Sequence, residues 1–370
     1  MAKLDVLIVG AGLYGAVCAE QLKQRGYRIK VIEKRDHIAG NAYTQIKESI
    51  AIHRYGAHIF HTNRADIWQY VNQFATFNRF TNSPLANFQG KLYNLPFNMN
   101  TFYQLWGVTT PEQAQQKLSQ QRAEMDGIEP QNLEQQAIAL AGRDIYERLI
   151  KGYTEKQWGK NTRELPAFII RRLPLRLTYD NNYFNDRFQG IPEQGYTEMV
   201  RQMLDGVDVQ LQCDFLKERE RWLSQTHFTI YTGPIDAYFD HCFGALGYRS
   251  LDFELKRFDS PNVQGNAVIN YTERHIPYTR TIEHKHFAPV DTPHSFISYE
   301  YPRHWQPGDE PYYPINDETN MALYKRYYQS ASRLKHIHFG GRLGQYRYFD
   351  MHQVIAAALH FCQKWHQVSQ

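Results

Sequence analysis

The sequence predicts an α/β fold in which a domain with a parallel sheet is discontinuous and two further domains are inserted into it. A strand–glycine–helix unit at the start of the chain, residues 4–33, is matched by a second such unit at its end, residues 337–362. Between them, residues 98–160 show the helical spacing of apolar side chains, and residues 263–300 alternate as antiparallel strands do. We expect the two end units to share one sheet and the middle of the chain to supply the insertions.

The first unit has the pattern of a dinucleotide-binding fold. Leu4–Val9 is a short apolar run, typical of a buried parallel strand, and Gly10, Gly12 and Gly15 follow it at once as G-x-G-x-x-G. These glycines allow a tight turn, close approach of a pyrophosphate to the backbone, and close packing of the next helix. Glu33 ends a second strand about 20 residues further on, where a carboxylate accepts the ribose hydroxyls. The unit predicts a Rossmann-like domain and leaves NAD or FAD open.

The residues after Glu33 favour a flavin nucleotide. Flavoproteins with this fold often continue from the acidic residue into an arginine and then a pair of glycines. Here Lys34 and Arg35 follow the acid, and Gly40 is followed by Asn41 where the second glycine would stand. The segment therefore looks like the flavin version of the fold, with one departure.

Three histidines, His53, His58 and His61, lie within nine residues and suggest a metal site. No Asp, Glu or Cys lies close enough in the sequence to complete such a site, and the spacing matches no common zinc pattern. A loop whose histidines face a cofactor is the favoured interpretation, and hydrogen-bonded structural histidines are the alternative. No metal is expected.

Composition and charge argue against several classes of protein. The net charge is only +4 and no block of lysine and arginine stands out, so nucleic acid is not expected as a partner. No signal peptide is recognisable, and no apolar stretch approaches the roughly 20 residues of a membrane helix. The four cysteines are isolated, which fits a reducing cytoplasm. The 26 tyrosines suit a site for sugars, bases and phosphates, or a tyrosine-rich core and surface.

The middle of the chain predicts a hairpin followed by helices. Leu85–Pro96 alternates around a turn at Gln89-Gly90, and Thr110-Pro111 is a helix start with proline at the first helical position. Further apolar residues recur at helical spacing and are interpreted as core: Leu133, Ala137, Leu140, Ile145 and Leu149.

Arg171, Arg172 and Arg176 place three cations within six residues of a loop that contains prolines. Arginine suits bidentate recognition of phosphate, and loops often supply such contacts. A solvated charged loop is an equally good explanation from the residues alone.

The last third predicts antiparallel strands and then the closing unit. Strands are expected at 266–270, 278–283 (with Arg280) and 295–299, a helix at 320–332, and Asp350 as N-cap of the final helix. The expected boundaries are 1–80, 190–245 and 330–370 for the Rossmann-like domain, 98–160 for the helical domain, and 81–97, 161–189 and 246–329 for the antiparallel sheet.

Several motifs resemble those of prokaryotic UDP-galactopyranose mutases. The resemblance covers nearly the whole chain and includes G-Y-T-E-K-Q-W-G at 152–159, Y-T-G-P-I-D at 231–236 and G-G-R-L-G-Q-Y-R-Y-F-D-M at 340–351. It implies an FAD-binding Rossmann-like domain with an inserted helical domain and a twisted antiparallel sheet. It also implies a homodimer.

The resemblance implies an enzyme that interconverts UDP-galactopyranose and UDP-galactofuranose and so supplies galactofuranose for cell-surface glycans. FAD would be active in its reduced form. In such enzymes flavin N5 attacks the anomeric carbon as UDP leaves, the sugar ring opens in an iminium intermediate, and reclosure gives the furanose. No protein nucleophile is needed, which agrees with the lack of a serine–histidine–aspartate or paired-carboxylate pattern.

By motif position, the resemblance also implies roles for individual residues. The catalytic residues would be Arg172, Arg280 and His61. The substrate-binding residues would be His58, Asn82, Tyr153, Trp158, Arg172, Tyr183, Arg280, Glu300, Tyr313 and Tyr348. The cofactor-binding residues would be Gly10, Gly12, Leu13, Gly15, Glu33, Lys34, Gly40, Asn41, His58, Ile59, Gly341, Arg342, Tyr348, Asp350 and Met351.

Two other functions share part of this pattern. An ordinary flavin oxidoreductase would share the first glycine motif, but it leaves the paired arginines and tyrosine-rich loops unexplained. A non-catalytic module for sugar nucleotides would bind UDP equally well in both flavin states and turn nothing over.

Overall fold

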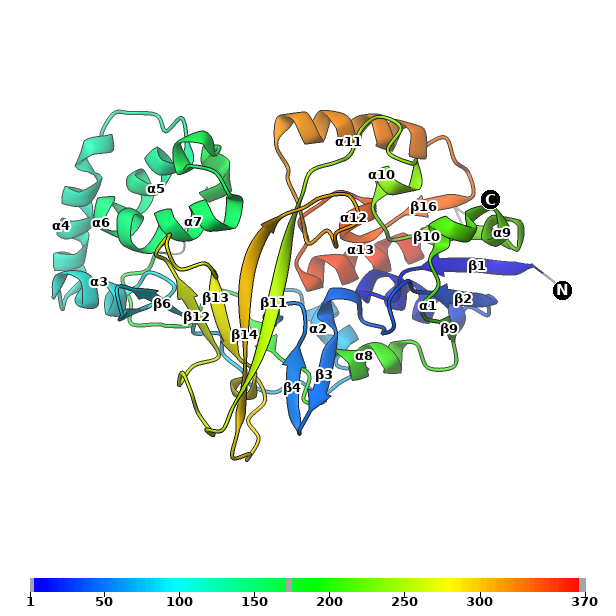
Figure 1. Cartoon of the computed structure of the whole chain (residues 1–370), viewed down its shortest axis with the longest axis horizontal. Coiled ribbons are helices and arrows are strands. Elements are labelled where there is room, and N and C mark those ends of the chain that lie inside the picture. Colours follow the sequence, from blue (N-terminus) through cyan, green and yellow to red (C-terminus); the bar gives the residue numbers. More distant parts are fainter. Residues whose placement is uncertain (1–2, 171–174, 366–370) are drawn as a thin grey trace.

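In the computed structural model, residues 3–170 and 175–365 are described. Figure 1 shows three parts side by side: an α/β part that holds the first strand, a long twisted sheet in the middle, and a cluster of helices on the far side of that sheet. This arrangement is the predicted fold class, a Rossmann-like α/β domain with a helical and an antiparallel insertion. The numerical domain boundaries stay a prediction.

The α/β part is built on a five-stranded parallel sheet that joins both ends of the chain. Its order is β16-β10-β1-β2-β9, so the predicted strand at 337–339 lies in the same sheet as the first strand. The strands are β1 (Leu4–Val9), β2 (Ile29–Ile32), β9 (Asp208–Gln210), β10 (Thr226–Tyr231) and β16 (Ile337–Phe339).

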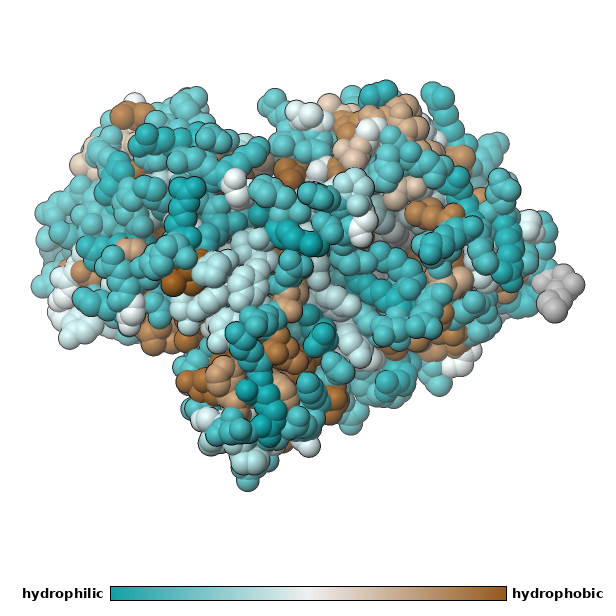
Figure 2. Space-filling view, viewed as in Figure 1, coloured by the Kyte–Doolittle hydropathy of each residue, from teal (hydrophilic) through white to brown (hydrophobic). Residues whose placement is uncertain are grey.

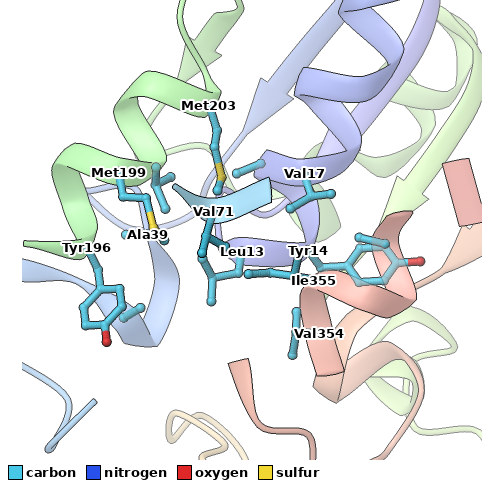
Figure 3. Close-up of a cluster of buried hydrophobic side chains, with 14 of the residues drawn as sticks. Leu13, Tyr14, Val17, Ala39, Val71, Tyr196, Met199, Met203, Val354 and Ile355 are labelled. Carbon is cyan, nitrogen blue, oxygen red and sulfur yellow. The ribbon is translucent and has the colours of Figure 1, made fainter. Parts of the chain in front are cut away.

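Both faces of this sheet are covered, as an apolar parallel strand requires. Val6 and Ile8 of β1 pack into one core cluster and Leu7 packs into another, so successive side chains enter opposite layers. Figure 3 shows the first layer, where α1 (Leu13–Gln24), α8 (Tyr196–Met203) and α13 (Met351–Gln363) bring their apolar side chains together. The other layer holds α9 (Arg219–Ser224), α10 (Ile235–Tyr238) and α11 (Glu318–Ala331).

The long sheet has seven strands in the order β15-β11-β14-β13-β12-β6-β7. Its strands pair antiparallel except β12 with β6, which run parallel. The hairpin of β6 and β7 turns at Gln89 and Gly90, both with positive φ, which confirms the predicted turn. The strands are β6 (Leu85–Phe88), β7 (Lys91–Asn94), β11 (Tyr248–Phe258), β12 (Val268–Tyr271), β13 (Arg280–Glu283), β14 (Ser295–His304) and β15 (Tyr313–Pro314).

The helical part has its own core. Leu133, Ala137, Ile145 and Leu149 of the predicted stripe are buried, and Leu140 is half-buried. Thr110 caps the second of these helices in a capping box, with proline at the first position as expected. The helices are α3 (Met99–Trp106), α4 (Pro111–Arg122), α5 (Leu133–Ala141), α6 (Arg143–Ile145), a π-helical turn (Tyr146–Ile150) and α7 (Lys151–Trp158).

Shorter elements connect these parts. Two small antiparallel pairs, β3 with β4 and β5 with β8, lie beside the α/β part; His53 ends β4, His61 lies on β5, and His58 lies in the loop between these two strands. Asp350 caps α13 in a capping box with Gln353, which confirms the predicted N-cap. The remaining strands and α-helices are β3 (Thr44–Lys47), β4 (Ile50–His53), β5 (Phe60–Thr62), α2 (Ala65–Val71), β8 (Phe188–Gly190) and α12 (Gly341–Gly344).

Candidate functional site

A cavity of about 250 Å³ lies where β1 turns into α1, and we call it the dinucleotide cavity. The closing unit reaches it through Gly341 and Arg342, so the two ends of the chain meet there as the sequence predicts. The predicted cofactor-binding residues that line it are Gly10, Gly12, Leu13, Glu33, Lys34, Gly40, Asn41, His58, Gly341, Arg342 and Met351.

The backbone around this cavity is closely packed. A Cβ on Gly15 would lie 2.0 Å from the carbonyl oxygen of Gly10, so Gly15 serves the approach of α1 to the strand and does not line the cavity. Gly12 is the N-cap of α1 and offers no side-chain cap, and the first turn of the helix has no acid, which leaves its positive end open to an anion.

The Glu33 carboxylate is buried and positioned by the backbone. Its Oε2 accepts the N–H of Ala11 at 2.9 Å and its Oε1 accepts the N–H of Arg35 at 3.0 Å. Each oxygen keeps a lone pair for another donor. A ribose hydroxyl is the donor that this type of acid receives in dinucleotide-binding folds.

A second cavity, of about 350 Å³, lies between the long sheet, α7 and the segment that follows α12, and we call it the arginine–tyrosine cavity. Figure 2 shows that the molecular surface is hollowed between the helical part and the α/β part. The predicted site residues that line this cavity are His58, Ile59, His61, Asn82, Tyr153, Tyr183, Arg280, Tyr313, Arg342, Tyr348, Asp350 and Met351.

The two cavities meet. His58, Arg342, Phe349 and Met351 line both of them, so a ligand in one would border a ligand in the other. A dinucleotide whose pyrophosphate lies at α1 would therefore have its far end close to a compound held among the arginines and tyrosines.

Arg280 is the best-defined cation of the arginine–tyrosine cavity. Its Nη2 donates to the hydroxyl of Tyr153 at 2.7 Å, and its Nε lies 3.2 Å from Oε1 of the buried Glu300. Burial disfavours the guanidinium charge, but Glu300 and then Tyr153 outweigh that effect and raise the pKa of Arg280 well above its usual range. Arg280 is therefore a fixed positive charge.

Arg342 provides a second cation at the junction. Its Nη2 donates to the carbonyl of Tyr312 at 2.9 Å, and the guanidinium lies 5.4 Å from the ring centroids of Tyr313 and Tyr348. Burial raises the pKa values of the Tyr153, Tyr183, Tyr313 and Tyr348 hydroxyls, which stay protonated and can donate to anionic oxygens.

His61 lies beside Asp186 and Asp350, and the sequence did not predict that these carboxylates would be its neighbours. Its Nδ1 lies 2.5 Å from Oδ2 of Asp186, and its ring stacks on Phe184. Ligand atoms of His61, Asp350 and His352 lie within 4.8 Å of one another, a grouping that could hold a metal ion. His53 and His58 do not belong to that grouping, so it differs from the one considered in the sequence.

Among the described residues, the predicted site residues Gly15, Glu300 and Trp158 line neither cavity. Glu300 acts on the arginine–tyrosine cavity through Arg280, Trp158 ends α7 and packs against the helical core, and Arg172 lies outside the described residues. Asn270, which was not predicted, lines the arginine–tyrosine cavity on β12 directly opposite Arg280. Val268 also lines this cavity, and side chains two residues apart on a strand point to the same face. Strand alternation could therefore have identified Asn270.

Comparison with known proteins agrees with this geometry. The family model for UDP-galactopyranose mutase matches residues 148–348, and one for an NAD(P)-binding Rossmann-like domain matches residues 8–74. A protein of Klebsiella pneumoniae named "probable UDP-galactopyranose mutase" is 43% identical, with 97% of this chain and 94% of that protein aligned.

The chain belongs to the UDP-galactopyranose mutase family.

Other members of this mutase family differ in their named substrates. A dTDP-fucopyranose mutase of Escherichia coli is 36% identical over 97% of each chain. A UDP-galactopyranose mutase of Mycoplasma genitalium is 32% identical over 97% of this chain and 94% of its own. The mutase relationship is therefore clear along the whole chain.

Solved structures agree with the fold. A reduced UDP-galactopyranose mutase aligns with a TM-score of 0.74 at 13% identity, covering 99% of this chain and 94% of its own. A putrescine oxidase aligns with a TM-score of 0.57 at 12% identity over 98% of each chain, and at this identity it shares the fold alone. Among the described residues, no helix of this mutase-family chain is long and apolar enough to cross a membrane.

Proposed function

We propose that this chain interconverts UDP-galactopyranose and UDP-galactofuranose in a reaction that depends on reduced FAD. Family membership and the names of its relatives support the substrate pair. The observation that carries the proposal is that the dinucleotide cavity and the cationic arginine–tyrosine cavity share lining residues. A flavin and a sugar nucleotide could thus meet at His58, Arg342 and Met351.

The residues of the dinucleotide cavity fit FAD. A Cβ on Gly12 would meet only Gly40, at 3.8 Å, so the glycine leaves open space at the uncapped start of α1 where a pyrophosphate can approach. Glu33 would hold the ribose, and Asn41 and Met351 would complete the lining. When bound in its reduced form, the flavin supplies the nucleophile for the anomeric carbon.

Arg280 would bind the diphosphate and stabilise the negative charge that grows as UDP leaves. A preorganised cation in a site with little water is the strongest electrostatic device of this kind. Its fixed charge and its anchoring to Glu300 and Tyr153 support this role. Arg172 is proposed as the second arginine of this clamp. His61 is proposed at the sugar, where Asp186 would orient its ring.

The tyrosines would position the substrate. Tyr153 is proposed to stack on uracil, with Trp158 on the same helix at the uridine side. Tyr183, Tyr313 and Tyr348 would donate hydrogen bonds to diphosphate oxygens, which their protonated hydroxyls permit. Asn82 would complete the substrate contacts. Closing the cavity around the sugar would exclude water from the reacting carbon.

The test is the conversion of UDP-galactofuranose by the purified protein, with and without dithionite, followed by chromatography. We expect UDP-galactopyranose to form only under reduction. Consumption of oxygen or NAD with oxidation of the sugar would instead identify an oxidoreductase. UDP binding without conversion in either flavin state would identify the protein as a non-catalytic module that binds sugar nucleotides.

A second candidate is the matching reaction on a deoxythymidine nucleotide. The 36% identical relative is named a dTDP-fucopyranose mutase, so the same fold and motifs accompany a different base and a 6-deoxy sugar. The two candidates are separated by supplying both furanose nucleotides at equal concentration to the reduced protein. A larger kcat/KM for the dTDP sugar would replace the first assignment and keep the reaction class. The homodimer and the cytoplasmic location stay predictions.

A further inference from the structure

Three histidines form a chain of hydrogen bonds that starts in the sheet core and ends at the junction of the two cavities. The backbone N–H of His58 donates to Nδ1 of His53 at 3.2 Å, and the backbone N–H of His53 donates to Nδ1 of His284 at 3.2 Å. Nε2 of His284 lies 2.7 Å from the hydroxyl of Ser298 on β14. His53, His284 and Ser298 are all buried.

These bonds define which ring nitrogens carry protons. A nitrogen that accepts from a backbone N–H has no proton of its own, so the neutral rings of His53 and His284 are protonated at Nε2. His284 uses that proton in its bond to Ser298. Burial, together with the charge of Arg54, lowers the pKa of His284 to about 3, and burial lowers the pKa of His53 as well, so both rings are uncharged at neutral pH.

Only one of the two ring nitrogens of His53 has a hydrogen-bond partner among the described residues: Nδ1 accepts from His58 and Nε2 is unpaired. Its Nε2 is buried and no described residue accepts from it, while its ring stacks on Phe287 with 4.6 Å between centroids. A buried donor without a partner is costly. Phenylalanine would keep the stacking and avoid that cost, so the property that distinguishes histidine here is the Nδ1 acceptor toward His58.

His58 is held at three points. Besides its N–H, its carbonyl accepts from the hydroxyl of Tyr196 at 3.1 Å, and its Nδ1 lies 2.8 Å from the carbonyl of Gly56. A carbonyl can only accept, so Nδ1 carries the proton and Nε2 keeps its lone pair. Burial and the charges of Arg342 and Arg280 outweigh the bond to Gly56 and lower the pKa of His58 to about 4. His58 lines both cavities.

We propose that His53 and His284 are positioning residues that hold the backbone of His58 in place. The carbonyl of Gly56 then keeps the neutral Nδ1–H tautomer, so that Nε2 of His58 accepts a hydrogen bond from a ligand N–H or hydroxyl where the two cavities meet. The identity of that ligand rests on the proposed function, but the tautomer does not. A cationic histidine would repel a positive centre that develops beside Arg342 and Arg280, whereas a neutral acceptor at this place stabilises it.

The first test is spectroscopic and needs no substrate. Two-bond ¹H–¹⁵N spectra of the purified holoenzyme, with ¹⁵N-labelled histidine, distinguish the two neutral tautomers, and the His58 signal is the one that His58→Gln removes. We expect Nδ1–H for His58 at neutral pH. An Nε2–H or doubly protonated His58 would overturn the proposal, and the outcome is independent of whether the protein is a mutase.

Matched variants of His53 separate positioning from packing. Asn can place its Oδ1 where Nδ1 lies and so keep the acceptor, whereas Phe keeps the ring and loses it. We expect kcat to fall about tenfold in His53→Phe and much less in His53→Asn, with KM nearly constant, because a buried N–H left unpaired destabilises the His58 turn. Equal losses in both variants, or none in His53→Phe, would overturn the positioning role.

If His53→Phe does not fold, Ser298→Ala tests the bond between His284 and Ser298, at the other end of the hydrogen-bonded histidines. Removing the hydroxyl takes away the partner of Nε2 of His284 and so loosens that ring. The His58 signal should then broaden or split, while the exposed control His227→Asn should leave it unchanged. A His58 signal that is identical in Ser298→Ala and the wild type would show that His284 plays no part.

Discussion

Arg280 and Glu300 stand opposite each other on the neighbouring antiparallel strands β13 and β14, with 3.2 Å between arginine Nε and glutamate Oε1. Glu300 also accepts from the hydroxyl of Thr279 at 3.2 Å, so both ends of the pair are fixed by the sheet. Nε of Arg280 faces Glu300, and Nη2 donates to the hydroxyl of Tyr153 at 2.7 Å. The pairing register of β13 and β14 therefore orients the guanidinium of Arg280.

Arg280→Ala should slow turnover strongly without releasing the flavin. The arginine lines the arginine–tyrosine cavity and not the dinucleotide cavity, so we expect kcat to fall about 10²- to 10³-fold, as for other preorganised charge-stabilising donors. Turnover is measured by chromatography and flavin content by its absorbance. Arg280→Lys keeps the charge but not the planar guanidinium, so its kcat should lie between those of the wild type and Arg280→Ala. Turnover close to that of the wild type in Arg280→Ala would remove Arg280 from the clamp.

Gly12→Ala should produce a folded protein that has lost its flavin. The φ of Gly12 is −77°, which any residue can adopt, and its Cβ would meet only Gly40 at 3.8 Å. The free energy of unfolding of the apoprotein should thus change by less than about 1 kcal/mol, while the methyl group fills the space that a pyrophosphate needs. Urea denaturation and flavin absorbance measure the two effects.

Gly15→Ala is the matched contrast, because a Cβ there would lie 2.0 Å from the carbonyl oxygen of Gly10. It should destabilise the fold itself. If Gly12→Ala purified with full flavin content, the pyrophosphate would have to lie elsewhere.

The parts of the site that the sequence predicts are those built from neighbouring residues. The unit from Gly10 to Glu33 needs only a strand, a turn and a helix, and each of these leaves a local pattern. Arg280 could be placed on a strand because its neighbours alternate. Strand β11 also alternates, with charged residues between Leu251, Phe253 and Leu255, but it was not predicted; its half-exposed outer part carries no continuous apolar run.

Contacts between distant segments left no such pattern. β12 pairs in parallel with β6, and Ile269 lies opposite Leu85, a partnership that neither segment encodes alone. Glu310, in the loop between β14 and β15, forms ion pairs with Lys34 and Arg35 and so ties that loop to the dinucleotide cavity. The histidine chain from His58 to Ser298 is likewise visible only once β4 and the turn after β13 are packed together.

Acid should destabilise this protein partly through His284. The pKa of His284 is about 3 in the folded state and 6.5 ordinarily. Between these two pH values the unfolded state therefore binds a proton at His284 and the folded state does not. Stability from this group is complete above pH 6.5 and is lost as the pH falls from there toward 3. By linkage, the loss amounts to about 2 kcal/mol at a pH of about 5.

His284→Asn removes the titrating ring and keeps an acceptor for the N–H of His53. Urea unfolding at pH 7 and pH 5 should therefore show a smaller loss in this variant than in the wild type. The exposed control His227→Asn should lose as much as the wild type. An unchanged pH dependence in His284→Asn would mean that His284 is protonated in the folded state.

Lys156→Met should weaken substrate binding more than it slows chemistry. Nζ of Lys156, on α7, donates to the carbonyls of Tyr271 and Tyr278 at 2.7 and 2.8 Å and so ties the helix to the ends of β12 and β13. Tyr153 lies on the same helix and contacts Arg280, so a looser α7 should misplace both the stacking ring and the cation's partner. We expect a loss of about 1–3 kcal/mol in unfolding free energy from the unpaired carbonyls and a roughly tenfold rise in KM.

The matched control is Lys151→Met on the same helix, where the ammonium forms a partly exposed pair with Glu147 one turn away. Such pairs contribute less than about 1 kcal/mol, so stability and KM should stay close to those of the wild type. Steady-state kinetics and urea denaturation of the two variants decide the matter. Equal effects of the two substitutions would show that α7 is held by its apolar face and that the lysine bond to the strand ends does not position the substrate.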